Sequence, residues 1–246
     1  MKKIVKWLPW ITLAAGAVGL VLRIWLYGQI DEKALLPDGH FAKTMLFVWT
    51  GLTVGALGFL IQPLNPVKNT ARLYPASIFR AVGCGAGAAG ILSAVLFSIT
   101  GYQGALDLFV ILTGLLAAVS LGYTAFLRLQ GRRPGLLMEV ATAAFFVVYA
   151  VSRCRVWGTE PQLVTYFFPL LACISLMIHT YDLAAHSGKR KHLVFFNQLA
   201  LYFCVVSLNE QNWSFYLGMA IWMLLDVCTL DCKRVRIEQP PEEAVE

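Results

Sequence analysis

The feature that most constrains this chain is a series of eight apolar stretches that together take up nearly its whole length. The hydrocarbon core of a bilayer is about 30 Å thick, so a helix needs about 20 apolar residues to cross it. The eight stretches lie near residues 4–27, 41–62, 77–100, 105–127, 135–152, 163–183, 192–208 and 213–230. The sequence therefore predicts an all-α integral membrane protein, a polytopic bundle of about eight transmembrane helices.

The composition supports the same class of protein. Of 246 residues, 58% are hydrophobic and 14% are charged, whereas soluble domains have about 25% charged residues. The net charge of +6 does not indicate nucleic-acid binding, because the basic residues form short clusters beside apolar segments and no long basic face. The sequence predicts the lipid bilayer as the surroundings of this chain and excludes nucleic acid as a partner.

The distribution of Lys and Arg predicts the orientation. If the N-terminus is cytoplasmic, 15 of the 20 basic residues fall on the cytoplasmic side, and Arg23, Lys33, Lys43, Arg153 and Arg155 fall outside. Cytoplasmic loops of membrane proteins carry an excess of Lys and Arg. We therefore expect both termini in the cytoplasm, and a location in the plasma membrane.

The last two stretches are short, and a re-entrant hairpin is an alternative to two crossings. We favour two crossings, because Trp213 and Tyr216 suit the outer interface of a membrane. Residues 1–236 are predicted to form one transmembrane bundle. The remaining residues, 237–246, form a short acidic tail that contains proline and is predicted to be disordered.

Small residues recur every four positions on several of these stretches. Because lipid provides no hydrophobic drive between helices, rows of small residues allow the close backbone approach that holds helices together. The residues predicted to pack helices in this way are Gly51, Gly55, Gly83, Gly87, Gly114, Ala118 and Gly122. Such faces also fit a partner membrane protein or a second copy of the chain.

The last four stretches carry polar residues at helical spacing. Ionisable groups at membrane depth are costly in lipid and should turn inward. The candidate binding residues for a small solute or lipid are Glu139, His179, Asp182, Asn197 and Asp226. They are predicted to share a polar cavity that opens to the cytoplasm, with His179 and Asp182, one helical turn apart, as the closest pair. The alternative is that these side chains snorkel to the headgroups.

Four further charged residues, Arg153, Arg155, Asp107 and Glu210, form a second candidate set at the outer rim. Two other arginines, Arg80 and Arg128, are interpreted as anchors at the inner membrane interface. Known catalytic and phosphate-binding motifs are missing from the sequence. No cofactor, metal site or catalytic residue is predicted.

Three functional hypotheses remain open. The leading one is a small transporter or permease-like subunit, whose pathway is the polar interior of the last four helices. The second is a non-catalytic membrane partner or regulatory subunit. The third, which makes the chain an enzyme, is an intramembrane lipid-modifying activity, with His179 as base and Asp182 or Glu139 as the carboxylate that orients it.

Overall fold

The computed structural model describes residues 2–29, 41–62, 77–102, 104–132, 134–157, 163–185 and 190–228. The helices are α1 (Lys2–Tyr27), α2 (Phe41–Ile61), α3 (Ile78–Thr100), α4 (Ala105–Leu129), α5 (Leu136–Trp157), α6 (Leu163–Ala184), α7 (Arg190–Val206) and α8 (Trp213–Cys228). A short 3₁₀ turn, η2 (Ser207–Asn209), follows α7. The predicted acidic tail, 237–246, lies outside the described residues.

Seven of these helices are long and apolar enough to cross a membrane, and α8 is a shorter apolar helix. The prediction of an all-α, multi-pass membrane bundle is confirmed. The outer faces of the helices carry large exposed apolar side chains, among them Leu52, Phe59, Leu96 and Val119. An apolar outer surface of this kind suits contact with lipid.

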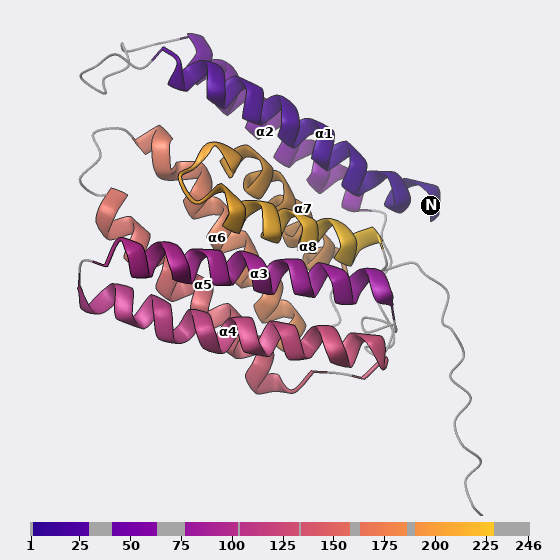
Figure 1. Cartoon of the computed structure of the whole chain (residues 1–246). Coiled ribbons are helices and arrows are strands. Elements are labelled where there is room, and N and C mark those ends of the chain that lie inside the picture. The colour runs from indigo at the N-terminus through magenta and orange to yellow at the C-terminus, as the bar shows by residue number, and fades with distance from the viewer. Residues whose placement is uncertain are drawn as a thin grey trace, which may run out of the picture.

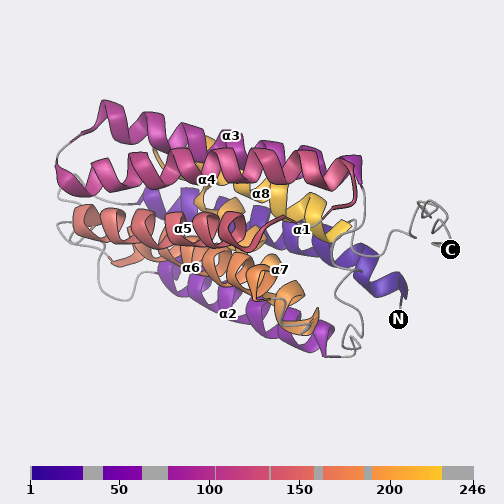
Figure 2. The same cartoon turned by 90° about the horizontal axis from the view of Figure 1, so that it is seen from below.

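The helices form a bundle in which α1 and α2 lie on one side and α3 and α4 on the other (Figures 1 and 2). Between them, α8 packs against α3, and α7 packs against α1, α6 and α8. The start of α1 and the end of α8 lie at the same end of the bundle (Figure 1), here called the proximal end. The turn between α7 and α8 lies at the other, distal end.

The distal turn reaches the same level as the last turn of α1, because Glu210 pairs with Arg23 near the end of that helix. The α7–α8 hairpin therefore extends as deep into the bundle as α1 does. This depth favours two crossings over a re-entrant hairpin.

Glycines allow the closest helix contact, between α3 and α8. A methyl group on Gly83 would lie 3.2 Å from Leu225 Cβ, and one on Gly90 would lie 3.2 Å from the Cα of Gly218. Gly87 likewise faces Trp222, and a methyl group on Gly87 would lie 3.1 Å from an atom of the Trp222 ring. These side chains have to be small because the neighbouring helix occupies the space in which a larger side chain would lie.

The close contact between α3 and α4 also depends on a glycine, Gly114, because a methyl group at this position would overlap Val95. One turn further, Ala118 is buried in the core. Both residues lie on the buried face of α4, which also carries Val110, Ala117 and Leu121.

The expectation of close packing is wrong within this chain for Gly51, Gly55 and Gly122. A methyl group on any of them would meet nothing within 4 Å among the described residues. The buried face of α2 is formed by Thr50, Thr53 and Leu57, so its two glycines lie on the exposed side of the helix. Spacing alone revealed the row of small residues but not the direction in which it faces.

Candidate functional site

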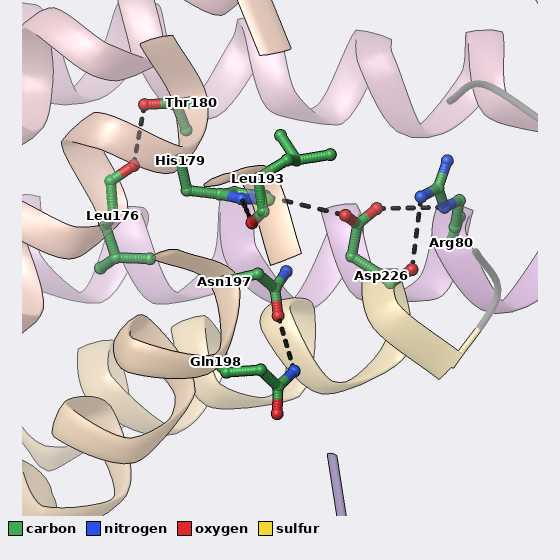
Figure 3. Close-up of polar contacts among 8 residues, drawn as sticks. All are labelled: Arg80, Leu176, His179, Thr180, Leu193, Asn197, Gln198 and Asp226. Atoms are coloured by element: carbon green, nitrogen blue, oxygen red, sulfur yellow. Dashed lines mark hydrogen bonds and ion pairs between the residues drawn. The ribbon is translucent and has the colours of Figure 1, made fainter. Parts of the chain in front are cut away.

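The polar centre at the proximal end is the carboxylate of Asp226, in the last turn of α8 (Figure 3). Arg80, in the first turn of α3, places its Nε 3.1 Å from Asp226 Oδ1 and donates from Nη2 to the Asp226 backbone oxygen at 3.3 Å. Both side chains are almost completely buried, at 1% and 3% exposure. A buried pair of this kind is stable only when both partners stay in place.

His179, on α6, approaches the same carboxylate from the opposite side (Figure 3). Its Nε2 lies 3.7 Å from Asp226 Oδ2, and its Nδ1 lies 3.3 Å from the backbone oxygen of Leu193 on α7. The ring is fully buried and meets Trp222 edge-on, with 6.4 Å between ring centroids. Four helices, α3, α6, α7 and α8, therefore contribute to one polar cluster.

The interpretation of Arg80 and Arg128 as interface anchors is wrong. Both side chains are buried, at 1% and 2% exposure. Arg80 turns inward because the buried carboxylate of Asp226, in the last turn of α8, lies beside it. The sequence shows how near a helix end an arginine lies, but not which neighbouring helix supplies its counter-charge.

The expected couple of His179 and Asp182 does not form. Asp182 instead pairs with His192 Nδ1, in the first turns of α7, and the His192 side chain is 47% exposed. The two residues of α6 point to different neighbours, since a separation of three positions rotates a side chain by about 60° around the helix. The enzyme hypothesis required this pair, or a pair of His179 with Glu139, and its roles do not fit the contacts of His179.

Glu139, in the first turn of α5, is buried and lines a small cavity together with Arg128. The cavity has a volume of about 20 Å³, which is room for a single water molecule. Its other polar lining residues are Cys84, Thr124, Thr142, Thr180 and Trp222. The cavity adjoins the Asp226 cluster, because Trp222 contacts both.

The candidate residues thus lie in separate groups. Asn197 belongs to a group near the middle of α7, away from the proximal end. Gln198 Nε2 donates to Asn197 Oδ1 at 3.4 Å, and Thr12 on α1 lies 2.6 Å from Gln198 Oε1. One turn further along α7, Tyr202 hydrogen-bonds Thr50 on α2 at 3.0 Å. These contacts connect α7 to α1 and α2, two helices that were not expected to contribute to the polar interior.

The distal end holds a second ionic cluster around Arg23, which is completely buried. Arg23 pairs with Glu210 and donates to the Val206 backbone oxygen at 3.0 Å and to the Tyr27 hydroxyl at 3.2 Å. Its guanidinium also lies 5.6 Å from the ring centroid of Phe168. Burial raises the pKa of the Glu210 carboxyl, and the charge of Arg23 opposes that rise.

Comparison with known protein families, curated proteins and solved structures found no match. The function of this chain is therefore inferred from its own residues.

The role of Arg23 was not predicted from the sequence, although the residues around it carry a signal. Thr12, Gly16, Gly19 and Arg23 are separated by four, three and four positions, which places them on one face of α1. That face packs on α7, since a methyl group on Gly16 would lie 3.0 Å from Val205 Cβ. A row of small residues that ends in an arginine predicts a buried charge at a close helix contact.

The other outer candidates make contacts of their own near this cluster. Arg153 stacks over Phe97, 4.6 Å from the ring centroid, and over Tyr149 at 5.3 Å. Ser152 donates to Asp107 Oδ1 at 3.3 Å. The side chain of Arg155 lies outside the described residues. Glu210 is the member of the predicted outer set that pairs with Arg23.

Proposed function

We propose that this chain is a small transporter or permease-like subunit of the plasma membrane, which moves a small polar solute through the interior of the bundle. The observation that carries the proposal is the course of α7. This helix is surrounded by α1, α2, α6 and α8, and its buried Asn197, Gln198 and Tyr202 continue the polar interior from the proximal cluster toward the distal one.

Polar groups at every depth of a bundle are costly in lipid and usually mark a pathway. The Asn197 amide supports this reading, because its Nδ2 is buried and has no hydrogen-bond partner among the described residues. An unsatisfied buried donor costs about 1–3 kcal/mol. A solute with an acceptor group would satisfy it.

Ion pairs close the two ends of this polar interior. Arg80 with Asp226 joins α3 to α8 at the proximal end, and Arg23 with Glu210 joins α1 to the distal turn. The proximal cavity of about 20 Å³ is too small for an organic solute. Transport therefore requires the helices to separate, and the two ion pairs are the contacts that would open in turn.

Thiol accessibility tests whether water reaches the middle of α7. In a variant without the native cysteines, Gln198→Cys is treated in sealed vesicles with a membrane-impermeant thiosulfonate, and Leu52→Cys is the matched control. Gln198 is buried at the middle of α7, whereas Leu52 faces outward at the middle of α2. We expect modification of Gln198→Cys alone. If the reagent modified neither thiol, a water-accessible pathway along α7 would be contradicted.

Flux is the direct test. The intact protein in proteoliposomes is offered radiolabelled amino acids, dicarboxylates and polyamines, one class at a time. We expect saturable uptake of one class, and its loss in Asn197→Leu. Uptake no greater than in protein-free liposomes for every class would overturn the proposal.

A second candidate function is that of a partner subunit, and the row of glycines on the exposed face of α2 favours it. Gly51 and Gly55 are exposed, and a methyl group on either would meet no described residue within 4 Å, so another helix could approach that face closely. Oxidative cross-linking of Gly51→Cys in native membranes would join two copies of the chain if they meet there, whereas the neighbouring Leu52→Cys would not. Absence of a cross-linked dimer at Gly51→Cys would contradict self-association through this face.

A further inference from the structure

The backbone oxygen of Leu193 determines which nitrogen of the His179 ring carries a hydrogen. Nδ1 lies 3.3 Å from this oxygen, and a carbonyl oxygen only accepts hydrogen bonds. The ring is fully buried, so solvent offers no other arrangement. The hydrogen-bond geometry therefore assigns the hydrogen of the neutral ring to Nδ1.

The assignment leaves Nε2 of the neutral ring as an acceptor, and it faces another acceptor. The distance from Nε2 to Asp226 Oδ2 is 3.7 Å, which is longer than a hydrogen bond of about 2.7–3.2 Å. The ring nitrogen and the carboxylate oxygen face each other across this gap (Figure 3), so with the hydrogen on Nδ1 their lone pairs repel. A single proton on Nε2 would convert the repulsion into a charge-assisted hydrogen bond.

We propose that His179 Nε2 and Asp226 Oδ2 form a binding site for one proton between α6 and α8. The proton comes from a hydronium ion of the acidified solution: one O–H bond of the hydronium breaks, its electron pair stays on the water oxygen, and a new N–H bond forms with the Nε2 lone pair. Binding of this proton is coupled to solute movement; the coupling rests on the proposed function, whereas proton binding does not.

The charges around the ring explain how a bound proton would act on the bundle. Arg80 of α3 holds Oδ1 of the same carboxylate, and Asp182 lies one turn further along α6. From α7 the ring meets the Leu193 carbonyl. Beyond Trp222, Glu139 of α5 and Arg128 of α4 line the small cavity. Protonated His179 shares the carboxylate with Arg80, which weakens the contact between α3 and α8.

Nitrogen NMR of the ring tests the site directly. The full chain is labelled with ¹⁵N-histidine, placed in lipid nanodiscs and titrated, and the His179 signals are identified by their loss in His179→Asn. The asparagine amide keeps a donor toward Leu193 and removes the base. We expect a neutral ring with hydrogen on Nδ1 in alkaline solution and a doubly protonated ring after acidification. Hydrogen on Nε2 in the neutral ring, or no protonation while the chain stays folded, would overturn the proposal.

Two variants separate the contribution of Asp226 from that of other carboxylates. Asp226→Asn removes the facing negative charge and should weaken proton binding at least about tenfold. Asp182→Asn, which removes a carboxylate paired with His192, should weaken it less. Equal effects of the two variants would show that Asp226 is not the partner, and so would overturn the site.

Flux measurements distinguish failure of this site from failure of the proposed function. If the ring binds a proton and no solute class is taken up, transport is wrong and the proton site stands. If uptake occurs and is driven by a pH gradient equally well in His179→Asn and in the natural chain, the coupling role is overturned while transport stands.

Discussion

Gly218 of α8 lies against Gly90 of α3 so closely that a methyl group on Gly218 would be 2.8 Å from the Gly90 Cα and 2.6 Å from the Ala86 oxygen. The contact is between backbones, so neither side can yield by rotating a side chain. The distance between α3 and α8 is therefore set by the absence of side chains at these two positions, and it also sets how Arg80 meets Asp226.

Even the smallest substitution should disturb this contact. We expect Gly218→Ala to lower the free energy of unfolding by about 1–3 kcal/mol, the usual effect of overpacking. The control is Gly85→Ala on α3, where a methyl group meets none of the described residues within 4 Å and alanine favours the helix. Melting in detergent compares the two variants. Equal melting temperatures would show that α3 and α8 are not in close contact.

The two aspartates at the proximal end should differ sharply in their effect on stability. Asp226→Asn leaves the buried Arg80 without its carboxylate, and breaking such a pair costs about 3–5 kcal/mol. Asp182→Asn breaks a pair whose histidine is half exposed, and we expect a loss of at most about 1 kcal/mol. Denaturant titration measures both, and a larger loss for Asp182→Asn would contradict the assignment.

Stability should depend on pH through Glu210. Burial raises the pKa of this carboxyl above 4.5, and the Arg23 charge opposes the rise. Because the folded chain then binds the proton more tightly than the unfolded chain, stability falls as the pH rises from 4.5 through the folded pKa. We expect Glu210→Gln to abolish this decline and Arg23→Gln to extend it to higher pH. Melting curves at a series of pH values test this prediction. If the melting temperature of Glu210→Gln changed with pH as that of the natural chain does, the role of Glu210 would be refuted.

The predicted orientation can be measured with single cysteines in a cysteine-free chain. Arg132 lies in the turn after α4, and Gln211 lies in the distal turn; both are exposed. An impermeant thiol reagent added outside intact cells should label Gln211→Cys and should label Arg132→Cys only after the cells are opened. Labelling of Arg132→Cys from outside would reverse or rule out the predicted topology.

The length and spacing of apolar stretches predicted the class of fold, because the length that a helix needs to cross a bilayer depends on that segment of sequence alone. Contacts between helices are not of this kind. Gly51 and Gly83 belong to similar rows of small residues, yet only Gly83 meets a neighbour among the described residues, since the direction of each face depends on where the other helices lie. Asp182 and His179 were paired by their spacing along α6, whereas the partners that they have come from α7 and α8.

The hydrogen bonds of α7 also bear on how the chain enters the membrane. A lone helix that carries Asn197 and Gln198 is poorly suited to lipid, and the Thr12 and Thr50 contacts that join this polar face to α1 and α2 come from helices made long before it. Since α1 and α2 pack mainly on each other and on α7 and the turn after it, they have little to dock on until α7 has been synthesised. The α1 and α2 helices, although they leave the ribosome before α7, are therefore among the last to reach their final positions.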